Sequence, residues 1–358
     1  MNWHLLRIVS AGLVGVLLLV GCASNPALVQ WTSDVLVAER KLQHREYAAA
    51  LADFERLEKN ALFRTDVVEM RMRQAEVYRR ANNFPSALKI MVDLENEKAW
   101  VDREQLAKIL YSKGRILDDA GASERAEALL TRVLNTFPNT AFGWRSWVFL
   151  KPRLERRLGE DAFIELCRKM FKRHRNTSIA DNFIFEAAHR YFLRKTPEGN
   201  VRARKLYERF MTIWIFETSG FWDDVAWELS LVYHRLGLYR DEESLLERFL
   251  ATREPGWPSP SDLKNYKYAY MRIAKLYMFE FEKPERAARL FQQYEEAFPY
   301  SIFRDDMLWW SGHAWLKAGK QSNAEQTWER LKKQYPESKY IRRIQAGYPA
   351  PTMETPIP

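Results

Sequence analysis

Three segments of this 358-residue sequence share one phrase, and this internal repetition constrains the fold more than any other feature. In each phrase an alanine is followed by a large apolar residue four positions later, by another apolar residue three positions after that, and by an aromatic-proline pair. Spacings of three and four residues place these side chains on one face of a helix, where the small alanine lets a neighbouring helix approach closely. The alanines are Ala126, Ala287 and Ala324, and the closing prolines are Pro138, Pro299 and Pro336.

Glycines accompany the first and last of these phrases at fixed offsets. Gly114 and Gly312 stand twelve residues before the alanines, where we expect the two helices of a hairpin to cross, and Gly121 and Gly319 fall in the predicted turns. The pattern resembles the tetratricopeptide repeat (TPR), a helix-turn-helix unit of about 34 residues. Because one such hairpin cannot bury its apolar face alone, the resemblance implies stacked hairpins whose first helices line a concave inner surface.

Looser copies of the phrase extend the repetition over most of the chain. They centre on Ala50, Ala87 and Glu242, and two degenerate copies pair helices over 143–158 with 160–174 and over 178–194 with 200–213, with the last turn lengthened by residues 196–200. The period-two alternation typical of strands is nearly absent. We therefore predict an all-α fold, a TPR-like right-handed α-solenoid of about eight helix-turn-helix repeats over residues 33–346. The first helix is expected to start near Trp31 or Asp34, and a proline-rich tail over 347–358 is expected to be disordered.

The N-terminal residues predict a membrane anchor. Residues 8–20 are apolar or small and would span about 20 Å as a helix, which is short of the roughly 30 Å hydrocarbon core, so we interpret residues 1–21 as a signal peptide. The run Leu19-Val20-Gly21-Cys22 resembles a bacterial lipobox, which implies cleavage after Gly21, a covalent lipid on Cys22 and a lipidated linker over 22–32. The alternative is an ordinary signal peptide with an incidental cysteine. Ala23, in place of an aspartate, resembles the outer-membrane class of such lipoproteins, so we expect a location on the periplasmic face of the outer membrane.

Positive charge is concentrated in the middle of the chain. Residues 151–209 contain 16 basic and 8 acidic residues, whereas 22–150 contain 19 and 18 and 210–358 contain 20 and 21. Two interpretations stay open for this basic belt: a surface for an anionic partner, or a solvated helical face. Nucleic acid is not expected as a partner in the periplasm. The candidate partner-binding residues are Arg168, Lys169, Lys172, Arg173, Arg175 and, in the proline-flanked loop 253–261, Trp257.

Patterns typical of catalysis or metal binding are weak. Glu186 and His189 have a spacing used in di-iron bundles but lack a second copy. The acid pairs at 223–224 and 305–306 immediately precede expected helices, where carboxylates cap N–H groups. Cys167 lies beside an apolar stripe and is expected to be buried. We therefore expect no enzyme, and no metal or cofactor other than the covalent lipid.

Two resemblances concern the C-terminal third. Residues 335–340 resemble the P-x-S-x-Tyr links of the lipoprotein subunit of the β-barrel assembly machinery, and residues 306–340 resemble the superhelical domain of soluble lytic transglycosylases. Those enzymes carry a catalytic Glu-Ser pair in a following domain, and the twenty residues after Ser338 are too few for one. We expect a non-catalytic scaffold that binds protein partners through its concave surface during envelope assembly of the β-barrel, pilus or secretion type. The alternative is an accessory of peptidoglycan metabolism that binds murein or a murein hydrolase.

Overall fold

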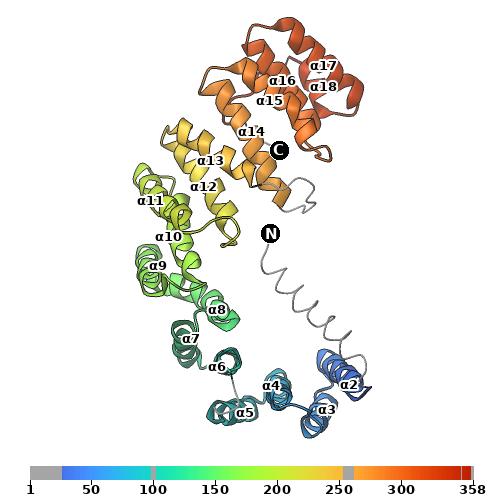
Figure 1. Cartoon of the computed structure of the whole chain (residues 1–358), viewed down its shortest axis with the longest axis vertical. Coiled ribbons are helices and arrows are strands. Elements are labelled where there is room, and N and C mark those ends of the chain that lie inside the picture. Colours follow the sequence, from blue (N-terminus) through green and yellow to red (C-terminus); the bar gives the residue numbers. More distant parts are fainter. Residues whose placement is uncertain (1–25, 98–101, 253–261, 348, 356–358) are drawn as a thin grey trace. The chain divides into compact units, whose positions relative to one another are not determined.

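The computed structural model describes residues 26–97, 102–252, 262–347 and 349–355 (Figure 1). Every regular element in these ranges is an α-helix. The expected lipidation and cleavage positions, Cys22 and Gly21, lie outside the described residues, and so does Trp257.

The helices form consecutive packed pairs. Eight pairs, from α2/α3 to α16/α17, are followed by the short α18, and successive helices pack on one another from α2 to α9 and from α11 to α18. The predicted all-α, TPR-like solenoid of about eight repeats is therefore confirmed. The seventeen helices of the described residues are α2 (Pro26–Gln43), α3 (Tyr47–Lys59), α4 (Arg64–Arg80), α5 (Phe84–Asn96), α6 (Arg103–Asp119), α7 (Ser123–Thr136), α8 (Ala141–Leu158), α9 (Glu160–His174), α10 (Ala180–Leu193), α11 (Pro197–Ile213), α12 (Trp222–Arg235), α13 (Tyr239–Ala251), α14 (Asp262–Phe279), α15 (Pro284–Ala297), α16 (Arg304–Lys317), α17 (Gln321–Gln334) and α18 (Lys339–Gln345).

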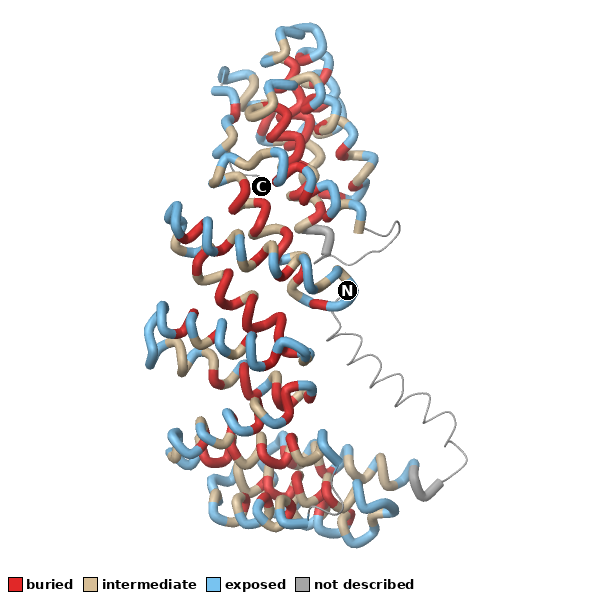
Figure 2. Tube along the Cα trace, turned by 60° about the vertical axis from the view of Figure 1, so that its left-hand side comes forward, coloured by how far each residue is buried: buried red, intermediate tan, exposed pale blue. Residues whose placement is uncertain are grey.

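The chain divides into two compact units, which are described separately. The N-terminal unit comprises residues 2–183 and the C-terminal unit comprises residues 184–358, so that the division falls within α10. Buried residues follow the seams between packed helices inside each unit, while the turns are mostly exposed (Figure 2). The right-handed course expected for the whole array stays a prediction.

One position is buried in all eight second helices of the described pairs. It is the fourth residue of the helix, and five of the eight residues there are alanines with no exposed surface, which confirms the alignment made from the sequence. Ala50 packs in one cluster with residues of α2 and α4, and Ala87 packs in another with residues of α4 and α6, so each cluster joins a helix pair to the next first helix. The residues at this position are Ala50, Ala87, Ala126, Phe163, Asn200, Glu242, Ala287 and Ala324.

Glu242 places a carboxylate at this buried position, with no exposed surface. It accepts hydrogen bonds from His234 Nδ1, 2.9 Å away, and from Arg272 Nε. A charge is tolerated in an interior only when partners replace its lost hydration. His234 belongs to α12 and Arg272 to α14, the helices before and after α13. A polar cluster therefore connects α13 to its two neighbours, whereas alanine packing makes this connection in other repeats.

Glycine marks the closest approach of two helices at two places, as the sequence indicated. A Cβ added at Gly114 would lie 2.7 Å from Leu130, and one added at Gly312 would overlap the indole ring of Trp328. The second helix therefore reaches the backbone of the first at these points.

Tyrosine–carboxylate hydrogen bonds recur between neighbouring helices of the C-terminal unit. Tyr335 donates to Glu295 over 2.6 Å, and Tyr277 donates to Glu243. Burial, followed by the hydrogen bond to the carboxylate, raises the pKa of Tyr277 and of Tyr335 to about 12. These hydroxyls therefore keep their protons and act as donors at any physiological pH.

Two local expectations differ from the structure. The first helix begins at Pro26, earlier than Trp31. Residues 197–200 do not lengthen a turn: Thr196 caps α11 by accepting from the Gly199 N–H, and Pro197 occupies the first helical position, where its missing N–H has no cost.

The described part of the tail, 349–355, contacts α14, since Lys275 Nζ donates to the carbonyl of Thr355 over 2.7 Å. The disorder expected for the tail over 347–358 stays a prediction.

We expect Gly312→Ala to lower the free energy of unfolding by about 1–3 kcal/mol, because the new methyl group would displace the Trp328 indole from a close-packed contact. Gly220→Ala is the matched control, since a Cβ at Gly220 meets nothing within 4 Å. Urea unfolding followed by tryptophan fluorescence measures both. Equal stability of the two variants would contradict the assigned close approach.

Asp306→Asn tests a buried carboxyl of α16. Burial, together with the charge of Asp305, raises the pKa of Asp306 to about 6 despite the hydrogen bond that Tyr340 donates to it. A carboxyl whose folded pKa is raised favours the folded state fully at low pH and loses that contribution as pH rises from about 4 to 6. At pH 7.5 the variant should therefore be about 2–3 kcal/mol more stable than the unaltered chain, with little difference at pH 3.5. A difference that does not change with pH would show that Asp306 does not titrate in this way.

Candidate functional site

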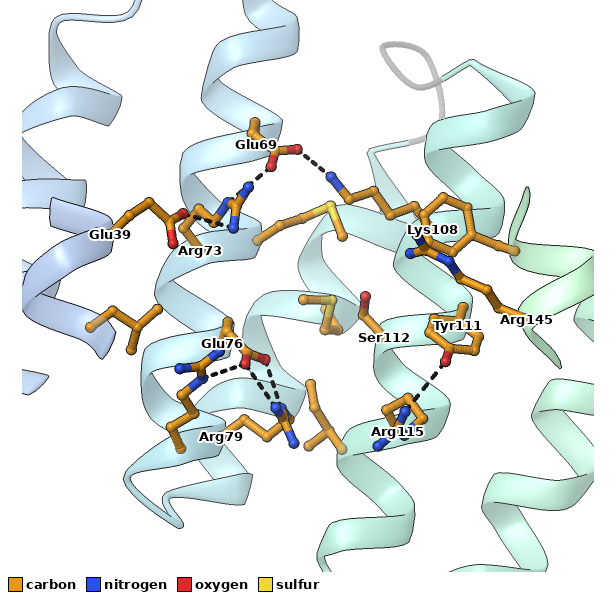
Figure 3. Close-up of a pocket in the computed structure, with 16 residues that line it drawn as sticks. Glu39, Glu69, Arg73, Glu76, Arg79, Lys108, Tyr111, Ser112, Arg115 and Arg145 are labelled. Carbon is orange, nitrogen blue, oxygen red and sulfur yellow. Dashed lines mark hydrogen bonds and ion pairs between the residues drawn. The ribbon is translucent and has the colours of Figure 1, made fainter. Parts of the chain in front are cut away.

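The N-terminal unit contains a groove of about 600 Å³ whose walls are almost entirely first helices. Figure 3 shows its side chains reaching inward from α2, α4, α6 and α8. The apolar part of the lining is formed by Leu42, Met72, Met91, Ile116 and Phe142.

Helical spacing brings the polar side chains of the groove together. On α4, residues 69, 72, 73 and 76 line it, and on α6, residues 108, 111, 112 and 115 do so. Both sets follow the i, i+3, i+4, i+7 pattern of a single helix face. The opposite faces of α4 and α6 carry apolar residues such as Met70, Val77, Ala107 and Leu110, which pack in the helix seams. Packing thus fixes the rotation of each helix and leaves the polar stripe facing the groove.

Two glutamates of α4 are each held by two cations. Glu69 lies between Arg73, 3.0 Å away, and Lys108, 2.5 Å away, and so links α4 to α6 (Figure 3). Burial works to raise the pKa of Glu69, but the hydrogen bond and charge of Lys108 outweigh it and lower that pKa. Glu76 pairs with Arg79 and Arg80, each at 2.7 Å, and its pKa is lowered in the same way against the effect of burial. These carboxylates stay ionised at neutral pH.

Two arginines at the other side of the groove have no carboxylate partner among the described residues. Arg115 of α6 donates to the Tyr111 hydroxyl over 3.3 Å, and its guanidinium lies 5.4 Å from the ring centroid of Phe149. Arg145 of α8 is exposed and lies 5.0 Å from the ring centroid of Phe142. Aromatic rings and a hydroxyl orient these guanidinium groups without neutralising them.

The groove is therefore electropositive. Its lining contains six basic and three acidic side chains, and each acidic side chain forms an ion pair with a basic residue of α4 or α6. Guanidinium groups bind carboxylates through two parallel N–H···O bonds. An anionic segment, above all one with carboxylate side chains, is the ligand that this arrangement accommodates.

The basic belt predicted from the sequence has a different setting. Residues 168–173 lie on α9, a second helix, and Arg175 follows its end, so these side chains are not on the first-helix face that the resemblance implied for a ligand. The basic side chains among them are exposed, and Arg168 pairs with Glu165 at 3.0 Å. Arg153 and Arg157 of α8 pair with Asp118 and Glu127. The belt residues at 202–205 belong to the other unit.

The other residues that the sequence suggested for catalysis or metal binding pack or pair with residues of the helices around them. His189 pairs with Glu228 at 2.9 Å, and this hydrogen bond raises the pKa of His189. The acids at 223–224 and 305–306 lie inside the first turns of α12 and α16, and the capping positions are Phe221 and Phe303, so their predicted capping role is wrong. Cys167 is fully buried, as expected. The described residues contain no cluster of three His, Cys, Asp or Glu side chains suited to a metal ion.

Comparison with known families agrees with the helix pairs. Residues 38–91 match one tetratricopeptide-repeat family model, and residues 306–338 match another. These two segments are tetratricopeptide repeats. Repeats of this kind generally bind other proteins through surfaces built by several stacked hairpins. The first matched segment, 38–91, supplies most of the α2 and α4 walls of the groove.

Several solved structures are distantly similar to this chain. The C-terminal part of a TPR-containing protein from Cytophaga hutchinsonii is 14% identical, with 86% of this chain and 98% of that chain covered and a TM-score of 0.36. PilW, a type IV pilus biogenesis factor, is 14% identical, with 67% and 99% covered and a TM-score of 0.38. At such TM-scores the similarities carry no argument about function. No curated protein matches the sequence.

Sequence reasoning missed the groove residues, above all Arg115 and Arg145. Counting charge by segment averages the two faces of every helix, and residues 22–150 are nearly neutral by that measure. The available signal was the polar stripe at i, i+3, i+4 and i+7 on α4 and α6, which lies on the first helices that the resemblance already implied as the ligand surface. Pairing of the acids could not be read from the sequence, because it depends on which helices are neighbours.

Proposed function

We propose that this protein is a non-catalytic scaffold of the bacterial outer membrane that binds an acidic segment of another envelope protein in the groove of the N-terminal unit. The observation that carries the proposal is the pair of guanidinium groups of Arg115 and Arg145, which face the groove without a carboxylate partner in the described residues. The TPR segments support a protein as the partner. The lipobox-like run at residues 19–22 supports the anchor.

The binding mechanism follows from the two sides of the groove. Ion pairs link α2 to α4 through Glu39 and Arg73, and α4 to α6 through Glu69 and Lys108. The arginines on α6 and α8 receive the carboxylates of the ligand. Charge sets the register of the ligand and speeds its encounter, while contact with Tyr111 and Phe142 excludes water from the bound segment. No described helix combines the length and apolar character needed to cross a bilayer, so in this proposal Cys22 provides the attachment.

In cells, a photoreactive residue at Ser112, which lines the groove, should give discrete protein adducts. The double variant Arg115→Gln, Arg145→Gln should reduce those adducts at least tenfold, since it removes both charges and keeps most of the packing volume. The matched control is Lys172→Gln, Arg173→Gln on the exposed face of α9, which should leave the adducts unchanged.

Two outcomes would contradict the proposal. Adducts that persist in the groove variant but vanish in the α9 variant would move the binding surface to the basic belt. Purified protein that is retained on intact sacculi in a salt-sensitive manner, and loses retention in the groove variant, would instead favour a murein-binding accessory role.

Cys22→Ser should abolish acylation and, with it, attachment to the outer membrane. Without the thiol no diacylglycerol can be added, and stable lipid anchoring depends on more than one acyl chain. Mass spectrometry of the purified chain and fractionation of inner and outer membranes measure both effects. A wild-type chain that is unacylated and recovered in the periplasmic fraction would overturn the anchor.

A further inference from the structure

The C-terminal tail lies against the first-helix face of the C-terminal unit in a patterned way. Pro351 is buried, and Met353 and Thr355 are half-buried, while Thr352 and Glu354 between them are exposed. The tail turns at its end, where the Thr355 N–H donates to the Thr352 carbonyl over 3.1 Å and the Thr352 N–H donates to the Thr355 hydroxyl over 2.8 Å. Pro351, Met353 and Thr355 therefore face the protein, with residues 352–355 folded into a turn against it.

The contact centres on a buried lysine. Lys275 belongs to α14, retains only 3% of its surface, and donates through Nζ to the main-chain carbonyl of Thr355 over 2.7 Å. The same Nζ lies 5.0 Å from the ring centroid of Trp310 on α16. Trp310 is itself fixed among aromatic side chains, with Phe291 and Trp309 at centroid distances of 5.7 and 5.6 Å. The Lys275 ammonium thus lies between the main chain of the tail and a buried aromatic cluster of the C-terminal unit.

This contact satisfies Lys275 poorly. An ammonium group has three donors, and the described residues give this one a single hydrogen bond and one aromatic face. Burial, followed by the charge of Arg272, lowers the pKa of Lys275 to about 8, which reports the cost of removing the ammonium from water. Removing the ammonium group from water therefore opposes the docked position of the tail.

We propose that the α14–α16 face around Lys275 is a docking surface for a proline-containing segment of a partner protein, and that the chain's own tail, 349–355, occupies this surface until such a segment displaces it. Recognition would rest on a main-chain carbonyl, one buried proline and an acidic residue beside the lysine, which are the features that the tail itself presents. The tail is tethered a few residues after α18, so its effective concentration is on the order of millimolar and it suppresses weak ligands. This surface is separate from the groove of the N-terminal unit.

The test uses the full chain and a fluorescein-labelled synthetic peptide with the sequence of residues 346–358. Pro351→Glu places a charge at the buried proline and should release the tail, so that this variant binds the peptide at least tenfold more tightly than the unaltered chain. Adding Lys275→Met to Pro351→Glu should remove that gain. Lys317→Met is the matched control on α16, since it removes another lysine that lies over an aromatic ring, that of Phe279, and it should leave the gain intact. Fluorescence anisotropy measures affinity, and thermal unfolding checks that each variant is folded.

A second measurement does not depend on the peptide. Acylation of lysines by acetic anhydride, read by mass spectrometry, should modify Lys275 at least tenfold faster in Pro351→Glu than in the unaltered chain, and added peptide should protect it again. Equal peptide affinity of Pro351→Glu and the unaltered chain would overturn the proposal. So would a gain that survives Lys275→Met, or Lys275 acylation that is unchanged by release of the tail.

Discussion

The structure depends on the burial of one residue, the fourth of each second helix, between its own hairpin and the next. Where that residue is alanine it has no exposed surface, and the clusters around Ala50 and Ala87 contain residues of three successive helices. A single hairpin could not exclude water from these side chains, so stacking is the condition for each repeat to be stable. In the N-terminal unit the stack uses one face of α4 and of α6, so the opposite faces are left for polar side chains, and that is where the groove lies.

The middle of the chain meets the same constraint by other chemistry. Phe163, Asn200 and Glu242 replace alanine and are still buried. Glu242 is compensated by His234 and Arg272, and Asn200 lies 3.4 Å from an Arg235 nitrogen. Together with the tyrosine–carboxylate bonds, these contacts give the C-terminal unit a core in which polar groups join neighbouring helices. Such clusters restrict which helices can pack side by side more narrowly than apolar packing does, because a buried polar group left unpaired is costly.

The two units present their first helices differently. In the N-terminal unit the groove is open. Its glutamates form ion pairs with basic residues of the same unit, whereas Arg115 and Arg145 have no carboxylate partner among the described residues. In the C-terminal unit the surface around Lys275 is covered by the chain's own tail. In both cases a cation is held over an aromatic ring, Phe149 or Trp310, so that its position is set before any ligand arrives. A pre-positioned charge loses little side-chain entropy on binding.

The approximate repeat number, the buried fourth position of the second helices, and the crossings at Gly114 and Gly312 could be predicted from the sequence. They depend on spacings of three and four residues and on the size of single side chains, which are local properties. The groove could not be predicted, because the pairing of Glu69 with Lys108 joins residues 39 positions apart and removes charge that a count along the chain still includes. The same limit holds for the tail, whose contact with Lys275 spans 80 positions. The sequence by itself determined which residues face the neighbouring helices of the stack. The tertiary structure decided which charged side chains at the surface have no ion-pair partner, because ion pairing depends on distance in space and not on distance along the chain.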